Sequence, residues 1–387
     1  MCGLCGFITH NKANLTAEQV KTRNQIFTVL LMAMQSRGTD SAGLVGITDD
    51  KWKLYKKAIE AFEFVKEEKY WETLNEKNNI VIGHTRQKTT GIVSDRNAHP
   101  FQRGNIVGAH NGMVSNYLEI DNKVDVDSEV IFSLLNKNKN NFTETFKKLS
   151  GSFAITWVDV SGANSVYLVA QDNPLALVNI KELKTYFWCS TKEDLAIVLQ
   201  ASVGLGKRDI WSPKQNTVYQ INTDFKITKH KVEFKEDNVF TGGGQSSSNY
   251  GKGYWEDDDL AYGKYGQANG ELETMEFVTE NSGCELCQQS IKFRKEDFYW
   301  NEAEETCLCF RCGLTERIMY EYDLITKNKI KEIEELEKMQ REEEEKEAEA
   351  DRLLEKYPQY AGKKKKKKNK WKKQTTIPFN RQLMSIN

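Results

Sequence analysis

Strand-like segments dominate the first 235 residues of the chain, and many of them follow one another with no helix between. Each is a short run rich in β-branched and aromatic residues, bounded by turn-forming residues. They cover residues 3–10, 42–48, 52–58, 80–86, 105–110, 153–159, 165–170, 186–190 and 217–221. Because parallel strands need a long crossover connection, usually a helix, this order favours antiparallel or mixed sheets over a doubly wound fold.

Helices are expected between groups of these strands. The first follows Thr16, which can cap it together with Gln19 three positions on, and it stops at Arg37-Gly38. Each expected helix offers an apolar stripe that can pack on a sheet. The others lie at about 60–75, 127–137, 142–149 and 192–202.

The composition changes after Phe240. Residues 241–270 are rich in Gly and Ser and contain the acidic run Glu256–Asp259, so this stretch cannot bury enough apolar surface to offset its ordering entropy. We expect a folded domain followed by more polar segments. The predicted boundaries are a domain over 2–235, a flexible linker over 236–270, a Cys-rich module over 271–325, a charged helix over 326–358 and a Lys-rich tail over 359–387.

Charge and hydropathy limit the partners and the cellular location that the sequence predicts. The formal net charge of -1 selects neither nucleic acid nor membrane as a partner. No apolar run approaches the roughly 18 residues of a membrane span, and the first residues lack the basic start and apolar core of a leader peptide. We expect no membrane partner and a cytoplasmic location, or a nuclear one if the host is eukaryotic.

Cys2 follows the initiator Met directly. A small side chain at this position permits removal of Met1, which leaves Cys2 with a free α-amine beside its thiol. Their reference pKa values, about 7.7–8.0 for the amine and about 8.5 for the thiol, allow one group to take the proton of the other. Two alternatives remain open: Cys2 is simply a small residue in an edge strand, or it forms a redox pair with Cys5.

Five motifs accompany Cys2. The segments Gln35–Gly43, Gly83–Gly91, Asn97–Phe101 and Ala109–Gly112, followed by Asp127–Val130, stand in the order and at the approximate spacing of class II glutamine amidotransferase domains. The chain resembles this family of amino-terminal nucleophile (Ntn) hydrolases, which includes amidophosphoribosyltransferase and glucosamine-6-phosphate synthase, over about residues 2–215. The resemblance implies an α+β fold, a four-layer αββα sandwich, and hydrolysis of the side-chain amide of L-glutamine.

The resemblance also assigns catalytic roles. Cys2 is the implied nucleophile, and Asn111 and Gly112 are the implied donors to the oxyanion, through the Asn side-chain amide and the Gly backbone N–H. Amide hydrolysis needs such fixed donors because its tetrahedral intermediate carries a negative charge. Asn-Gly is also the commonest two-residue hairpin turn, which is the alternative for this pair.

Free glutamine carries a carboxylate and an ammonium group that a pocket must pair. By resemblance, Arg86 grips the carboxylate and Asp127 the ammonium, while Thr89 and His99 lie near the substrate. Asp127 could instead, or in addition, cap the helix that follows it. No metal or other cofactor is needed for this reaction, and His84 and His110 are expected to be hydrogen-bonding scaffold.

Arg37 and Asp40 lie at the end of the first expected helix. By resemblance they shape the surroundings of Cys2, and the alternative is an ion pair that closes the helix. The sequence departs from the family at Gln87 and Lys88, where relatives carry an aromatic residue, often followed by Ala. The departure concerns the loop that closes over glutamine.

In the family, ammonia usually travels to a synthase site on the same chain. The polar sequence after residue 235 resembles neither a phosphoribosyltransferase nor sugar-isomerase domains, so we expect an ammonia-accepting synthase on a separate partner protein. The alternative is a catalytically idle amidotransferase-like scaffold whose zinc module and basic tail bind protein or nucleic acid.

Five of the eight cysteines lie between Cys284 and Cys312. Two Cys-x2-Cys pairs separated by 21 residues suit a tetrahedral structural zinc. The predicted ligands are Cys284, Cys287, Cys309 and Cys312; Cys307 either replaces Cys309 or stays free. The nine lysines from Lys363 to Lys373 could neutralise nucleic-acid phosphates, or form a solubilising tail that folds back on the acidic helix.

Overall fold

The structure is a computed structural model that describes residues 2–48, 51–201, 209–236, 298–301 and 306–356. The chain divides into two compact units, Met1–Met319 and Tyr320–Asn387. Most of the described elements, and every predicted site residue outside the Cys-rich module, belong to the first unit. Within the described residues, no helix is both long enough and apolar enough to cross a membrane.

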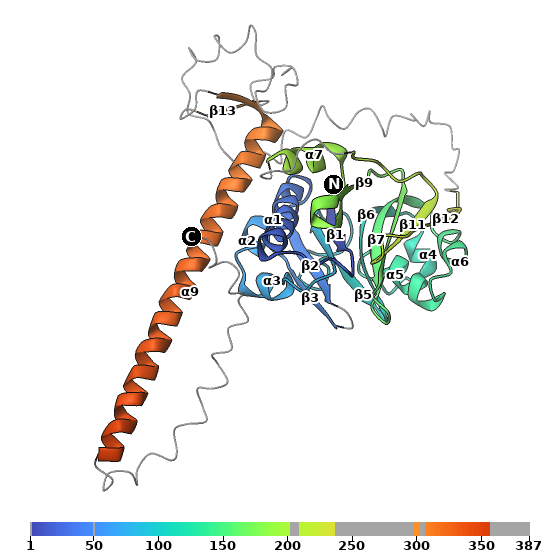
Figure 1. The fold of residues 1–387 in the computed structure, drawn as a ribbon. Coiled ribbons are helices and arrows are strands. Elements are labelled where there is room, and N and C mark those ends of the chain that lie inside the picture. Colours follow the sequence, from blue (N-terminus) through green and yellow to red (C-terminus); the bar gives the residue numbers. More distant parts are fainter. Residues whose placement is uncertain (1, 49–50, 202–208, 237–297, 302–305, 357–387) are drawn as a thin grey trace. The chain divides into compact units, whose positions relative to one another are not determined.

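Two six-stranded sheets form the framework of the first unit (Figure 1). The first sheet has the order β3-β2-β4-β1-β10-β9, and all neighbouring strands within it are antiparallel. Its strands are β1 (Gly3–Thr9), β2 (Ser41–Thr48), β3 (Lys51–Lys57), β4 (Ile80–Arg86), β9 (Ala176–Ile180) and β10 (Thr185–Cys189).

The second sheet has the order β12-β11-β8-β7-β6-β5 and is also antiparallel throughout. Its strands are β5 (Phe101–Arg103), β6 (Ile106–Val114), β7 (Gly151–Asp159), β8 (Ser165–Gln171), β11 (Thr217–Asn222) and β12 (Ile227–Lys231). All nine expected strands are present. The expectation of antiparallel or mixed sheets is confirmed, with every strand pair of the two sheets antiparallel, whereas β5, β9 and β12 were not expected.

The two sheets pack face to face through alternate residues of their strands. Leu4 and Ile8 of β1 and Ile80 and Ile82 of β4 point into this layer, where they meet Ala109 and other apolar residues of the second sheet. Successive side chains of a strand point to opposite faces. The remaining residues of β1 and β4 therefore point to the outer, helix-covered face of the first sheet.

Helices cover the outer faces of both sheets (Figure 1). Helix α1 (Ala17–Ala33) packs on β1 and β4, with α2 (Ala61–Phe64) and α3 (Glu68–Thr73) beside β2 and β3. On the second sheet, α5 (Ser128–Lys137) and α6 (Phe142–Phe146) cover an apolar cluster built around Phe132, Phe153 and Trp157. The two sheets and their helices thus make an α+β arrangement.

The predicted starts of the helices agree with the structure, but two of the predicted helices are not continuous α-helices. Thr16 caps α1, and its hydroxyl and the Gln19 side chain form the expected reciprocal pair of hydrogen bonds. The expected helix over 60–75 is two short helices, α2 and α3. The first helix ends at Ala33 and continues as the 3-10 turn η1 (Met34–Arg37). Further short elements are α4 (Tyr117–Ile120), η2 (Lys181–Leu183) and α7 (Lys192–Ala201).

The carboxyl-terminal part contains a hairpin followed by one long helix. Strands β13 (Phe298–Asn301) and β14 (Thr306–Cys309) are antiparallel, and helix α9 (Phe310–Lys356) follows directly. The predicted charged helix thus begins earlier than residue 326 and runs without a break through the proposed end of the Cys-rich module. The predicted tail, the predicted linker apart from Glu236, and Cys284 and Cys287 lie outside the described residues.

Candidate functional site

At one end of the layer between the sheets, polar residues replace apolar ones. Along β4 the residues that face this layer are Ile80, Ile82, His84 and Arg86, and along β1 Cys2 stands two positions before Leu4. The register sets Leu4 opposite His84 and Gly3 opposite Thr85, so Cys2 lies beside the carboxyl end of β4. Alternation alone therefore brings the thiol and the guanidinium to the same edge of the inter-sheet layer.

The Cys2 thiol is held by the backbone that leaves β4. Its Sγ accepts from the amide of Gln87 over 3.3 Å and lies 3.4 Å from the carbonyl oxygen of Gln87. Arg37 Nε donates to the Cys2 carbonyl over 2.9 Å. Burial raises the pKa of this thiol and the charge of Asp127 adds to the rise, while the Gln87 amide and the Arg86 charge oppose it.

Cys5 does not share the surroundings of Cys2. Three residues apart on an extended strand, the two side chains point to opposite faces of the sheet. Cys5 is buried on the helix side, where its Sγ lies close to Gly83. A Cys2–Cys5 disulfide would need a different backbone, so the redox-pair alternative is wrong for this fold.

Asn111 and Gly112 lie inside β6, opposite Ala154 and Phe153 of β7. The hairpin-turn alternative for this pair is therefore wrong. Asn111 Nδ2 donates to Ser190 Oγ over 3.0 Å, and its Oδ1 is buried without a protein partner. Gly112 adopts φ +128°, and a Cβ there would lie 1.9 Å from the Ser152 carbonyl oxygen, so only glycine fits.

Arg86 and Asp127 lie close enough for their charges to act on each other and on Cys2. The Arg86 guanidinium donates to the carbonyls of Thr90 and Ile92. The Asp127 carboxylate accepts from the Thr90 hydroxyl over 2.9 Å and from the Val114 amide over 2.8 Å. Asp127 occupies the N-cap position of α5, but its side chain makes no capping hydrogen bond.

Three further predicted residues, Asp40, Thr89 and His99, lie around this edge of the inter-sheet layer. Asp40 accepts from the Lys88 amide over 2.7 Å, so it holds the segment that follows Gln87. Thr89 is exposed in that segment. His99 is buried, and its ring lies 4.1 Å from that of His84, centroid to centroid.

Burial lowers the pKa values of three histidines at and beside this edge. Burial lowers the pKa of His84 to about 3 and lowers those of His99 and His110 in the same direction. His84 Nε2 donates to the carbonyl of His110 across the two sheets over 3.2 Å. His110 itself points to the other face of β6, where Nδ1 shares a hydrogen bond of 2.9 Å with the Ser128 hydroxyl.

Three residues of the site were not foreseen from the sequence. Ser190 and Thr90 contact Asn111 and Asp127 as described above. Lys56 Nζ donates to the carbonyls of Arg96 and Ala98 over 2.9 and 2.6 Å, and so holds the loop that carries His99. Only Thr90 gave a local signal, because it lies inside the Gly83–Gly91 motif.

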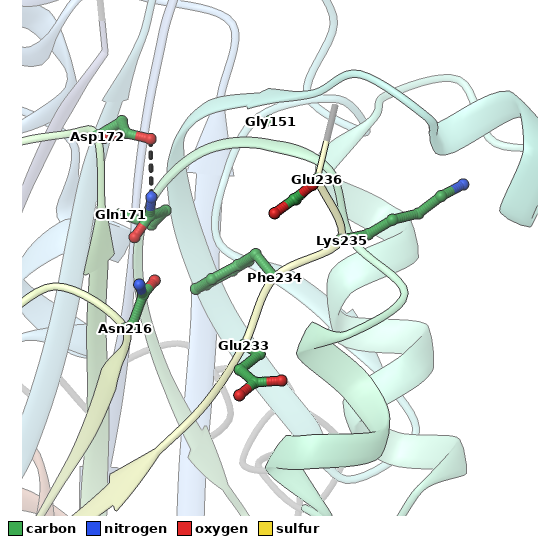
Figure 2. Close-up of a pocket in the computed structure, with 8 residues that line it drawn as sticks. All are labelled: Gly151, Gln171, Asp172, Asn216, Glu233, Phe234, Lys235 and Glu236. Carbon is green, nitrogen blue, oxygen red and sulfur yellow. Dashed lines mark hydrogen bonds between the residues drawn. The ribbon is translucent and has the colours of Figure 1, made fainter. Parts of the chain in front are cut away.

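A separate open pocket of about 640 Å³ lies elsewhere on the first unit (Figure 2). It shares no residue with the predicted site, and its lining is mostly polar. Phe234 in its wall stacks on Phe153, on the face of the second sheet that the helices cover. The lining residues are Gly151, Gln171, Asp172, Asn216, Glu233, Phe234, Lys235 and Glu236. No nucleophilic thiol or histidine lines it.

The zinc prediction lies mostly beyond what the structure describes. Cys309 ends β14, and Cys312 lies in the first turn of α9. In the part of the chain that the structure covers, no group of three His, Cys, Asp or Glu side chains is arranged to hold a metal ion.

The family model for the glutamine amidotransferase domain matches residues 84–196. The glutamine–fructose-6-phosphate aminotransferase (isomerizing) of Pyrococcus horikoshii is 32% identical over 195 residues, which cover 46% of this chain and 30% of that protein. The enzyme of the same name from Aquifex aeolicus is 33% identical over 191 residues, 45% of this chain and 30% of its own length. The chain therefore spans about 30% of the length of these curated relatives.

Among solved structures, the glutamine phosphoribosylpyrophosphate amidotransferase from B. subtilis, complexed with ADP and GMP, matches with a TM-score of 0.45 and 19% identity, over 59% of this chain and 49% of that one. A glutamine aminotransferase class-II domain protein from Silicibacter pomeroyi matches with a TM-score of 0.38 and 10% identity, over 60% of this chain and 100% of that one. The family match and the sequence relatives agree with the order of the motifs, and on them the chain carries a glutamine amidotransferase domain.

Proposed function

We propose that this domain, with the four-layer fold of the Ntn hydrolases, hydrolyses the side-chain amide of L-glutamine and delivers the ammonia to an acceptor site on a partner protein. The observation that carries the proposal is that Cys2, Arg86 and Asp127 lie together at one edge of the inter-sheet layer. Ser190 also links Asn111 to Leu4 of β1, the strand that follows Cys2. Thiol, guanidinium and carboxylate match the amide, the carboxylate and the ammonium of glutamine.

Arg86 and Asp127 orient the substrate in this mechanism, with Thr89 and His99 beside it. After removal of Met1, the α-amine of Cys2 accepts the proton of the thiol, and Sγ attacks the side-chain carbonyl carbon. A neighbouring base is needed because burial raises the pKa of the thiol above its ordinary value. Proton transfer from the α-ammonium to the amide nitrogen releases ammonia and leaves a γ-glutamyl thioester. Water, deprotonated by the amine, then attacks the thioester and yields glutamate and free Cys2.

Asn111 and Gly112 stabilise the tetrahedral oxyanion. One hydrogen of the Asn111 amide bonds Ser190, and the second is available to the oxyanion together with the Gly112 backbone N–H. Arg37 and Asp40 position the machinery, because Arg37 bonds the Cys2 carbonyl and Asp40 bonds the Lys88 amide.

As part of this proposal, the ammonia acceptor lies on a partner protein, and the polar residues 236–387 lie beyond the amidotransferase-like part. We also propose that Cys284, Cys287, Cys309 and Cys312 hold one structural zinc, which four thiolates at this spacing suit. The zinc takes no part in glutamine hydrolysis.

The decisive experiment measures ammonia and glutamate released from L-glutamine by the full chain, with intact mass to verify the loss of Met1. An electrophilic glutamine analogue should label Cys2 and stop ammonia release. The Cys2→Ala protein should be inactive, whereas Cys5→Ala, altered on the opposite face of β1, should keep its labelling at Cys2. Ammonia release by Cys2→Ala would refute the assignment, and a wild-type protein that neither reacts nor hydrolyses glutamine would favour the scaffold alternative.

A further inference from the structure

A single loop contacts the thiol, the guanidinium and the carboxylate that the proposed function matches to glutamine. The backbone of Gln87 bonds the Cys2 thiol, and the carbonyls of Thr90 and Ile92 accept from the Arg86 guanidinium. The hydroxyl of Thr90 donates to Asp127. These contacts come from residues 87–92, immediately after β4.

The contact between Thr90 and Asp127 involves the carboxylate that is proposed to bind the α-ammonium group. Thr90 Oγ1 donates to Oδ1 over 2.9 Å, and Oδ2 accepts from the Val114 amide over 2.8 Å. The Asp127 amide in turn points to Thr90 Oγ1 at 3.5 Å. Both carboxylate oxygens therefore already have a protein donor, and Asp127 is only 2% exposed.

The contacts of Arg86 repeat this pattern at the other end of the proposed ligand. One guanidinium nitrogen donates to the Thr90 carbonyl, and the other donates to the Ile92 carbonyl over 3.4 Å. A carboxylate gripped bidentately needs both nitrogens. The segment from Thr90 to Ile92 thus bridges Arg86 and Asp127, the two groups that an α-amino acid would bridge.

We propose that Thr90 sets the affinity for the amino-acid substrate, because its hydroxyl bonds Asp127 in the free protein and competes there with the α-ammonium. The inference rests on the proposed function of Arg86 and Asp127. A ligand with both a carboxylate and an ammonium group competes with both sets of loop contacts, whereas a ligand with one of these groups competes with only one set. The apparent dissociation constant is raised by the fraction of molecules in which the loop occupies the site.

The test compares Thr90→Val, which keeps the branched shape and removes the hydroxyl, with Thr90→Ser, which keeps the hydroxyl. Binding of L-glutamine is measured by calorimetry in full-length Cys2→Ala protein, where no turnover interferes. Removal of a competing hydrogen bond to a charged group should lower the Kd of Thr90→Val by about tenfold. Thr90→Ser should bind like the Cys2→Ala parent.

A weaker or unchanged affinity in Thr90→Val overturns the proposal, and weaker binding would mean that the hydroxyl helps to hold the substrate. Hydrogen exchange over residues 87–93 provides a second readout, and it should be faster in ligand-free Thr90→Val than in Thr90→Ser. Ammonia release by proteins that retain Cys2 reports on the proposed function separately. If glutamine binds and the affinity changes as expected while no ammonia is released, the hydrolytic function fails and the role of Thr90 stands. Absence of glutamine binding in all three proteins overturns both.

Discussion

The side-chain amide of Asn111 donates to the hydroxyl of Ser190 over 3.0 Å, and the same hydroxyl accepts from the Leu4 amide over 2.9 Å. Ser190 is fully buried at the end of β10. It therefore ties β6 of one sheet to β1 of the other, two residues beyond Cys2. The link fixes the proposed oxyanion donor relative to the proposed nucleophile.

Replacing Ser190 with Ala should lower kcat for glutamine hydrolysis by about tenfold, with little change in KM. The Asn111 amide would lose the partner that orients it, and this donor acts mainly on charge that develops in the transition state. Steady-state ammonia release gives both constants.

Ser161→Ala provides the matched control, because Ser161 is exposed just beyond the far end of β7. Thermal unfolding of both variants separates a loss of orientation from a loss of fold. An unchanged kcat in a folded Ser190→Ala protein would mean that β6 alone orients Asn111.

Much of the fold could be predicted because its signals are local. Buried strands such as β1 and β4 are apolar runs with clear ends, and Thr16 with Gln19 marks the start of α1. The missed strands β5, β9 and β12 are only three to five residues long and lie at sheet edges. Strand β12 is also rich in lysine, as edge strands often are.

Only those residues of the candidate site that belong to a sequence motif could be predicted. Cys2, Arg86 and Asn111 stand in motifs whose order identifies the family. Ser190 could not be found in this way, since it joins Asn111 across 79 residues and Leu4 across 186. Such contacts depend on how the two sheets pack, and no local pattern encodes that packing.

The free energy of unfolding of the domain should fall as the pH drops from about 6.5 toward 5. The folded-state pKa of His84 is about 3, below the ordinary 6.5, and those of His99 and His110 are lowered too. The unfolded chain therefore binds more protons in this range, and stability present above pH 6.5 is lost on acidification. Each such histidine contributes a slope of up to about 1.4 kcal/mol per pH unit. Urea unfolding at pH 7, 6 and 5 measures it.

The comparison stops at pH 5 because carboxylates with lowered pKa values, such as Glu67, begin to contribute below their ordinary range. His84→Leu should show a shallower slope than the parent. Equal stability of the parent at pH 7 and pH 5 would contradict the prediction.

Lys56→Met should loosen residues 94–100, the loop that holds His99 against His84. The Lys56 amine donates to two carbonyls of this loop and lies 4.7 Å from the centre of the Phe101 ring. Burial, with the nearby charges of Arg103 and Arg86, lowers its pKa to about 8, so it is still mostly charged at pH 7. Hydrogen exchange at pH 7 should show faster exchange of the loop amides, and kcat/KM for glutamine should fall several-fold.

Lys53→Met is the control on the same strand. The Lys53 side chain is exposed, and its amine forms a surface ion pair with Glu72, 3.7 Å from a carboxylate oxygen. It should leave the exchange of residues 94–100 unchanged. If Lys56→Met also leaves it unchanged, the loop is held by its packing on Gly43, where the carbonyl of His99 lies against the strand.

The purified full chain should contain one zinc per molecule, measured by atomic emission after dialysis. The choice between Cys307 and Cys309 follows from their places in the chain. Cys309 is the last residue of β14, and Cys312 lies within the first turn of α9, so the pair spans the step from strand to helix. Cys307 lies further back, paired with Trp300 in the hairpin. Cys309→Ser should therefore lose the zinc and Cys307→Ser should retain it.

The reverse result would make Cys307 the ligand, and a wild-type chain without zinc would remove the metal from the proposal. Because the zinc takes no part in the proposed hydrolysis, Cys309→Ser should still release ammonia from glutamine at the parental rate.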